Sequence, residues 1–181
     1  EDGFRARLDV SNPRQPAPIG TPFAKSHAIN AVHPATGLIA TAYSRNSLTT
    51  PGAALSLWQI NQDGVTETWS LPSDSSVSTT MHLDFDAEGK RLLRVTPQPH
   101  NHLIIHDVRT GAVLLDVMHE AYKALFAGTN SNIIAISSEL QPDNTQKGNI
   151  NILDSRNGRT LAVKHRFRAR DATISAVSFH P

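Results

Sequence analysis

The sequence predicts an all-β protein built from repeated four-stranded modules. Four short apolar stretches end in the same way, and they read ARLDV, LSLWQI, LIIHDV and INILDS. When Leu8, Trp58, His106 and Leu153 are aligned as one column, the steps between them are 50, 48 and 47 residues. A repeat of this length, whose strand closes on an aromatic-Asp-like pair, indicates supersecondary units that stack side by side.

Two further observations support this fold class. Ala31-Val32-His33-Pro34 near the start of the chain matches the segment that ends in Phe179-His180-Pro181, and the two prolines lie 147 residues apart, which is three steps of 49. Apolar residues also come in short, often alternating runs that Gly, Pro, Asn or Asp interrupt every 8–15 residues. This pattern is typical of strands and turns, and it leaves little room for a long helix.

The strands are expected in the following order. The chain opens with strands at 4–10 and 17–23, where Pro13, Pro16 and Pro18 confine the second strand to a sheet edge. The first full module has strands at 28–32, 38–43, 54–60 and 65–71. The second has strands at 81–85, 91–96, 102–108 and 112–117, and the third at 123–126, 133–137, 149–153 and 160–167. A last inner strand begins near residue 174.

These modules predict a β-propeller with four-stranded antiparallel blades. We assign one partial propeller to residues 1–181, with a blade end at 1–23, blades at 24–72, 73–118 and 119–170, and a blade start at 171–181. A propeller closes into a ring to remove its sheet edges, and three full blades are too few for that. We therefore expect the chain to be part of a longer propeller, whose other blades lie elsewhere in the protein or on another chain.

Composition narrows the classes of function. The chain has 17 basic and 16 acidic residues and a net charge of +1, which gives no general reason to expect a nucleic-acid or anionic-membrane partner. No apolar run approaches the roughly 20 residues that a membrane helix needs. The chain contains no Cys, which excludes a disulfide framework and a thiolate metal site.

The chain resembles the WD-repeat (WD40) propellers. In that family a blade opens near a Gly-His pair and its third strand ends in Trp-Asp. Here Ser26-His27 and Trp58-Gln59 stand at those places, whereas His106-Asp107 and Leu153-Asp154 keep the Asp and lose the Trp. Family blades also tie their strands with a buried hydrogen-bonded chain of side chains. The resemblance implies that His27, Thr41, Asn46 and Trp58 form this network in the first full blade.

The resemblance also implies a function. It favours a non-enzymatic scaffold for protein–protein interaction within a multi-protein complex, with other proteins as partners, no membrane, no cofactor and an intracellular location, cytoplasmic or nuclear. One alternative is a substrate receptor of a cullin-type ubiquitin ligase, since such receptors carry W-D-x-R pairs whose Arg contacts an adaptor. The two Asp-x-Arg pairs of this chain lack the Trp. Asp107 with Arg109 and Asp154 with Arg156 have this spacing, which is also a good strand-to-turn transition. Another alternative is a metal- or cofactor-dependent propeller enzyme.

Two other groups of residues are candidate sites. His100, His102 and His106 have a spacing that could bind zinc or copper, although ordinary turn and blade histidines explain them as well. Lys164, Arg166, Arg168 and Arg170 alternate, so that a regular strand would place all four on one face, where an anion or a partner could bind. The other interpretation is an outer strand whose charges prevent edge pairing.

No catalytic constellation stands out. The motifs G-x-S-x-G and H-E-x-x-H and a Gly-rich phosphate loop are all absent. Asp84, Asp86 and Glu88 could act as acid and base, but a turn after a strand explains them without catalysis. The loops at 44–52 and 139–148 both join second and third strands, and we expect them to emerge on the same rim, where binding or a harmless insertion would explain their length.

Overall fold

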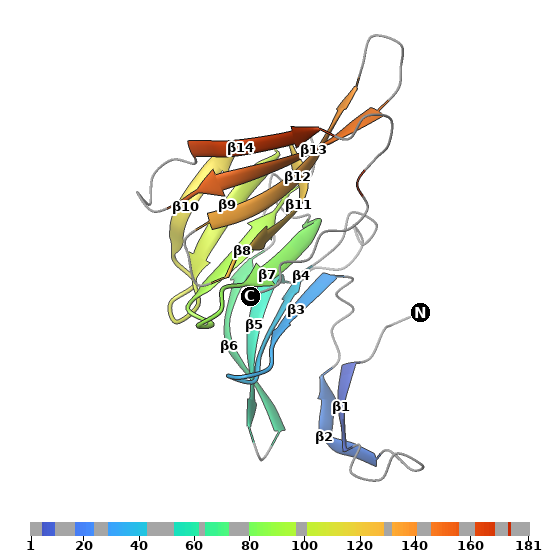
Figure 1. The fold of residues 1–181 in the computed structure, drawn as a ribbon. Coiled ribbons are helices and arrows are strands. Elements are labelled where there is room, and N and C mark those ends of the chain that lie inside the picture. The colour runs from blue at the N-terminus through green and yellow to red at the C-terminus, as the bar shows by residue number, and fades with distance from the viewer. Residues whose placement is uncertain are drawn as a thin grey trace.

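The structure is a computed structural model that describes residues 5–9, 17–23, 29–42, 53–61, 64–72, 80–96, 101–128, 132–140, 146–155, 162–168 and 174. Every regular element in these ranges is a strand, and the strands form three four-stranded antiparallel sheets and one two-stranded ribbon (Figure 1). The predicted all-β class with four-stranded antiparallel blades is therefore confirmed. No helix long and apolar enough to cross a membrane occurs in the part of the chain that the structure describes.

Each sheet is a meander in which strands that follow one another in sequence are paired. Blade 1 contains β3 (Ile29–His33), β4 (Leu38–Ala42), β5 (Ala53–Asn61) and β6 (Gly64–Pro72). Blade 2 contains β7 (His82–Phe85), β8 (Arg91–Val95), β9 (His102–Asp107) and β10 (Val113–Met118). Blade 3 contains β11 (Ala121–Phe126), β12 (Asn132–Leu140), β13 (Gln146–Asp154) and β14 (Ala162–Arg168).

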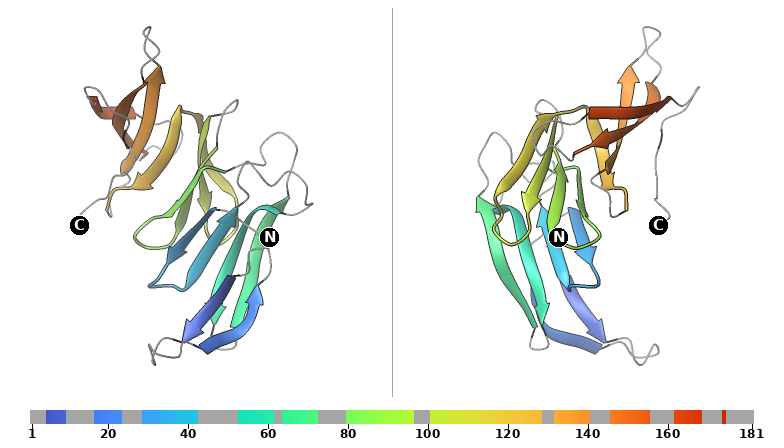
Figure 2. Two further views of the ribbon diagram at one scale, coloured as in Figure 1. Left: turned by 90° about the vertical axis from the view of Figure 1, so that its right-hand side faces the viewer. Right: turned by 60° about the vertical axis from the view of Figure 1, so that its left-hand side comes forward.

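The blades are arranged side by side with their first strands innermost. β7 contacts both β3 and β11, and the three sheets fan out from these strands (Figure 2). The ribbon of β1 (Arg5–Asp9) and β2 (Ala17–Phe23) lies next to blade 1, where β2 contacts β6. This is the arrangement of neighbouring propeller blades around one axis.

The middle strands of blade 2 are apolar on both faces, and both faces are covered by neighbouring blades. In β8 and β9, the side chains of Leu92, Leu93, Leu103, Ile104 and Ile105 are all buried, although successive residues of a strand point to opposite sides. One side packs against blade 1 in a cluster that includes Leu57 and Leu92, and the other packs against blade 3 in a cluster that includes Leu93 and Ile133. Two apolar cores therefore lie between the three blades, one at each junction.

Polar contacts join blade 1 to blade 2. The indole N–H of Trp69 donates to the carbonyl of Val108 at 2.7 Å. Nε2 of His33 lies 3.1 Å from the carbonyl oxygen of Ala87. The carbonyl can only accept, so the imidazole N–H is the donor. Gly89 has φ +65°, and a Cβ there would lie 3.0 Å from Nδ1 of His33. The close approach of the two blades at this turn therefore requires a glycine.

Two segments differ from the sequence-based expectation. In the third blade, β12 and β13 continue past Ser137, and their last pair is Leu140 with Gln146. The loop that was expected at 139–148 is therefore shorter, because both of its ends belong to the paired strands. In β13 and β14 the register shifts between Ile152 and Leu153, whose partners are His165 and Val163. This β-bulge inserts Lys164 as an extra residue. The expected loop at 44–52 lies outside the described residues.

We expect Trp69→Phe to loosen both blades that Trp69 joins. The change removes the donor to Val108 and should lower the free energy of unfolding by about 1–2 kcal/mol. Hydrogen–deuterium exchange should rise in β9 and β10 as well as in β6. Trp58→Phe is the matched control, because its indole bonds within blade 1. Faster exchange confined to blade 1 in the Trp69 variant would contradict this role.

Candidate functional site

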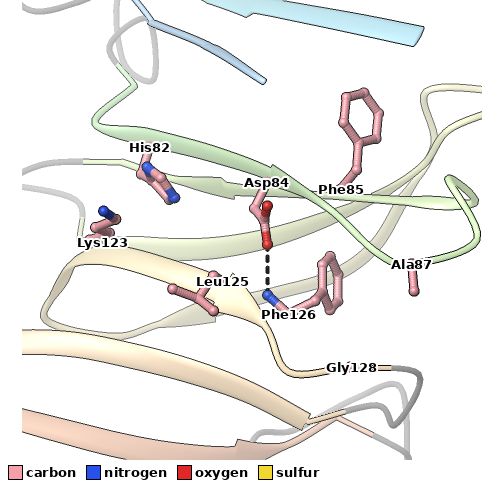
Figure 3. Close-up of a pocket in the computed structure, with 8 residues that line it drawn as sticks. All are labelled: His82, Asp84, Phe85, Ala87, Lys123, Leu125, Phe126 and Gly128. Atoms are coloured by element: carbon pink, nitrogen blue, oxygen red, sulfur yellow. Dashed lines mark hydrogen bonds between the residues drawn. The ribbon is translucent and has the colours of Figure 1, made fainter. Parts of the chain in front are cut away.

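A pocket of about 400 Å³ lies between the innermost strands of blades 2 and 3 (Figure 3). We call it the inner pocket. β7 contributes two polar side chains to it, and β11 contributes one. The lining residues are His82, Asp84, Phe85, Ala87, Lys123, Leu125, Phe126 and Gly128.

Asp84 is held between the two blades. The backbone N–H of Phe126 donates to its Oδ2 at 2.8 Å, as Figure 3 shows by the dashed line. Burial nevertheless raises the pKa of Asp84 to about 6, since the desolvation of the carboxylate outweighs the two backbone N–H groups that stabilise its charge. Asp84 therefore changes its charge close to neutral pH, which an exposed turn carboxylate does not do.

The neighbours of Asp84 complete a group of mixed charge. Burial lowers the pKa of His82 to about 4, and the nearby charge of Lys123 adds to this effect. At neutral pH the pocket therefore holds a neutral imidazole, a carboxylate that is mostly ionised and a lysine ammonium. These groups can bind a polar ligand or pass a proton, but none of the lining residues is a Ser, Thr or Cys that could act as a nucleophile.

Sequence reasoning missed this pocket. Asp84 lies within β7, in agreement with the expected strand at 81–85, and Asp86 and Glu88 fall in or beside the turn that follows. The sequence did not indicate that Asp84 contacts the next blade. Asp86 closes that turn by accepting the backbone N–H groups of Lys90 and Arg91. The available signal was the alternation in His82-Leu83-Asp84-Phe85, which places two ionisable groups on one face of a strand.

The histidine candidates have separate structural roles. His102 pairs with Asp116 through Nδ1. His106 is buried, and its Nδ1–H donates to the carbonyl of Gly111 at 3.1 Å. Burial lowers the pKa of His106 and keeps it neutral. His100 lies outside the described residues, and within the described part of the chain no three His, Cys, Asp or Glu side chains gather as metal ligands.

Half of the expected blade network can be seen. The indole of Trp58 donates to Oγ1 of Thr41 at 2.9 Å, and both residues are buried. This bond joins β4 to β5, so it ties the second strand of blade 1 to the third. His27 and Asn46 lie outside the described residues, and their part in the network stays a prediction.

The Asp-x-Arg pairs use their carboxylates within the chain. Asp107 accepts the N–H and the hydroxyl of Thr110, and these bonds lower the pKa of Asp107. Arg109 is exposed beside it. Asp154 lies 3.2 Å from Nζ of Lys164. Arg156 lies outside the described residues, so the adaptor role of the two pairs stays a prediction.

The basic strand does not present all its charges on one face. The bulge turns Lys164 toward Asp154 and Asn132, while Arg166 donates to Asn151 at 2.9 Å on the other side of the sheet. Arg166 and Arg168 line a polar hollow of about 520 Å³ together with His119, Glu120, Ser137, Asn149 and Asn151. Arg170 lies outside the described residues. Binding of a partner or an anion by this strand remains a prediction.

Comparison with known proteins supports the fold and does not assign a function. No protein-family model matches the chain, and no protein of curated function matches its sequence. A solved structure of a putative 6-phosphogluconolactonase from Bacteroides uniformis superposes with a TM-score of 0.63 at 10% identity, covering 91% of this chain and 48% of that one. The C-terminal WD40 domain of Sif2 superposes with a TM-score of 0.50 at 13% identity, covering 94% of this chain and 56% of that one.

A third match, from a nidogen/laminin complex, has a TM-score of 0.50 at 11% identity and covers 90% of this chain and 60% of that one. The chain thus has the β-propeller fold, and the predicted resemblance to WD40 propellers is confirmed at the level of fold. It spans about half to three fifths of the length of the solved structures it matches. These structures differ in kind, and fold alone does not assign a function.

We expect Asp84→Asn to stabilise the chain at alkaline pH. The folded-state pKa of about 6 lies above the ordinary aspartate pKa of 3.8, so the wild type loses stability as pH rises through 6. The amide keeps an acceptor for Phe126 and carries no charge. At pH 8 the variant should gain about 1–2 kcal/mol in free energy of unfolding, after allowance for solvent screening.

At pH 4 the two proteins should unfold at the same denaturant concentration, because the wild-type carboxyl is then protonated. Urea titrations at both pH values measure this difference. An equal shift at both values would show that the substitution acts through packing instead. The His82 titration is common to both proteins: it removes stability as pH falls from 6.5 to about 4, and so cancels in the comparison.

Proposed function

We propose that this chain is a segment of a non-enzymatic β-propeller that serves as a platform for protein–protein assembly. The observation that supports this most is the apolar character of the outer strands. On β10 the side chains of Val113, Leu114 and Met118 are 56%, 47% and 78% exposed, and on β14 Phe167 is 55% exposed. Large apolar side chains that stay exposed along a strand can form contacts with other proteins.

The exposed side chains of β10 lie at the outer edge of blade 2. β10 is the last strand of its sheet, farthest from the innermost strand β7. Further blades added around the axis would cover the faces of blades 1 and 3 and leave the outer edge of blade 2 uncovered. The exposed side chains of β10 would therefore stay available to a partner in a complete ring.

The inner pocket does not favour an enzyme over this proposal. Its ionisable groups are a carboxylate that bonds the next blade, a neutral imidazole and a lysine, and its lining residues include no Ser, Thr or Cys. Joining two blades explains Asp84 without a reaction. An enzyme would need further catalytic groups from other blades.

The proposal predicts that a partner protein purifies with the chain and contacts β10. Leu114→Glu/Met118→Glu should reduce the recovered partner at least about tenfold, because two charges would be buried in the contact. Thr66→Glu on β6 is the control, since it adds charge to an exposed outer strand without removing an apolar group. Quantitative mass spectrometry of tagged chain from its native cells measures the recovery.

The opposite result would be a chain that purifies without any stoichiometric protein, together with a small ligand or a turnover that Asp84→Asn abolishes. That outcome would favour the ligand-binding or enzymatic class of propeller. Loss of partner in the Thr66 control as well would assign the effect to charge and not to the apolar strand.

A further inference from the structure

A second hollow, of about 590 Å³, lies between blades 1 and 2. We call it the blade 1–2 groove. It is located at the end of the sheets where the turns at 34–37, 86–90 and 107–110 come together. Its size is within the range of roughly 300–1,000 Å³ that is usual for ligand pockets. None of the residues predicted from sequence as metal ligands lines it.

The floor of the groove is apolar and continuous with the core. Leu38, Leu57 and Val108 line it, and all three belong to the cluster that packs blade 1 against blade 2. The floor is therefore fixed by the packing of two sheets. Trp69, whose indole bonds the carbonyl of Val108, helps to hold this wall in place. A bound side chain would meet a preformed apolar surface at little cost in ordering.

The rim of the groove is positive. The side chains of Lys90 and Arg109 line it, and neither has an ion pair or a side-chain hydrogen bond within the described residues. One carboxylate also lines the groove, since Asp107 lies there and its charge interacts with that of Arg109. Asp107 accepts both polar groups of Thr110, and Asp86 accepts the backbone N–H groups of Lys90 and Arg91 and the guanidinium Nε–H of Arg91. The rim therefore carries two cations and one carboxylate beside an apolar floor, so positive charge exceeds negative charge.

The uncharged polar groups that line the groove contribute little to ligand binding. Gln59 donates through Nε2 to the carbonyls of Thr36 and Ile60, so its amide hydrogens are used within blade 1. Thr68 is exposed on β6 and offers a hydroxyl at the outer end of the groove. A ligand would therefore be selected by apolar contact with the floor and by charge at the rim.

We propose that the blade 1–2 groove binds a short extended segment of a partner protein that combines an apolar side chain with acidic residues. This inference rests on the proposed scaffold function and names the kind of partner segment. The apolar side chain would cover the accessible parts of Leu38 and Val108, and the carboxylates would pair with Lys90 and Arg109. Two cations over an apolar floor match an acidic-apolar peptide better than a nucleic-acid backbone, which needs a longer basic track.

Selection from a random peptide phage library on the purified chain tests this inference. The enriched peptides should contain at least one aliphatic or aromatic residue flanked by Asp or Glu. A fluorescein-labelled copy of the most enriched peptide then gives dissociation constants by fluorescence polarisation. Raising the salt from about 50 to about 500 mM NaCl should weaken binding several-fold, because the rim charges are exposed.

Two groove variants and one control separate the contributions. Lys90→Glu/Arg109→Glu should weaken binding at least about tenfold through charge reversal. Thr68→Trp should weaken it about fivefold by filling the groove while leaving both cations and the buried floor intact. Arg166→Glu/Arg168→Glu makes the same change in net charge on blade 3 and should leave the dissociation constant within about twofold. Circular dichroism confirms that each variant is folded.

Three results would overturn the inference. Enriched peptides could lack acidic residues, the groove variants could bind as tightly as the wild type, or no peptide could be enriched at all. If binding were lost only in Arg166→Glu/Arg168→Glu, the polar hollow of blade 3 would be the peptide site. The scaffold proposal would survive that result, since it depends on the co-purified partner and the β10 variants.

Discussion

Burial of both faces of the middle strands of blade 2 is the constraint on which the rest of the structure depends. A four-stranded sheet with apolar residues on both sides cannot remain alone in water, because each exposed face would cost the free energy of hydrating its side chains. β8 and β9 meet this requirement by packing against blade 1 on one side and blade 3 on the other. The stacking of blades follows from this property of the sequence.

The polar interactions are arranged around those two cores. Trp69 and His33 bond backbone carbonyls of blade 2, and Asp84 accepts a backbone N–H of blade 3. Each uses a side chain of one blade and the main chain of the next, so each fixes the relative position of two sheets that have no ladder in common. Arg91 adds a contact at the second junction, where its guanidinium lies 4.9 Å from the ring centre of Phe126. The candidate sites are hollows beside these junctions.

The repeat was sufficient to predict the fold class and the strand order, because each module carries the same apolar runs and turn residues. The sites were harder to predict, since they depend on contacts between modules that a single strand does not reveal. Asp84 reads as an ordinary strand residue before a turn, and its role becomes visible only when the neighbouring β11 supplies the N–H of Phe126. Lys164 reads as one of an alternating row until the bulge turns it toward Asp154. In both residues the role depends on a neighbouring strand, which the local sequence does not reveal.

Contacts between methyl groups of different blades test the central claim most directly. In a chain with labelled Leu, Val and Ile methyl groups, nuclear Overhauser effects should connect Leu57 of blade 1 with Val108 of blade 2, and Leu93 of blade 2 with Ile133 of blade 3. Both pairs belong to the shared cores that join adjacent sheets. Cross-peaks confined to strands of the same sheet would contradict the face-to-face packing of blades, and the account of both junctions would fail with it.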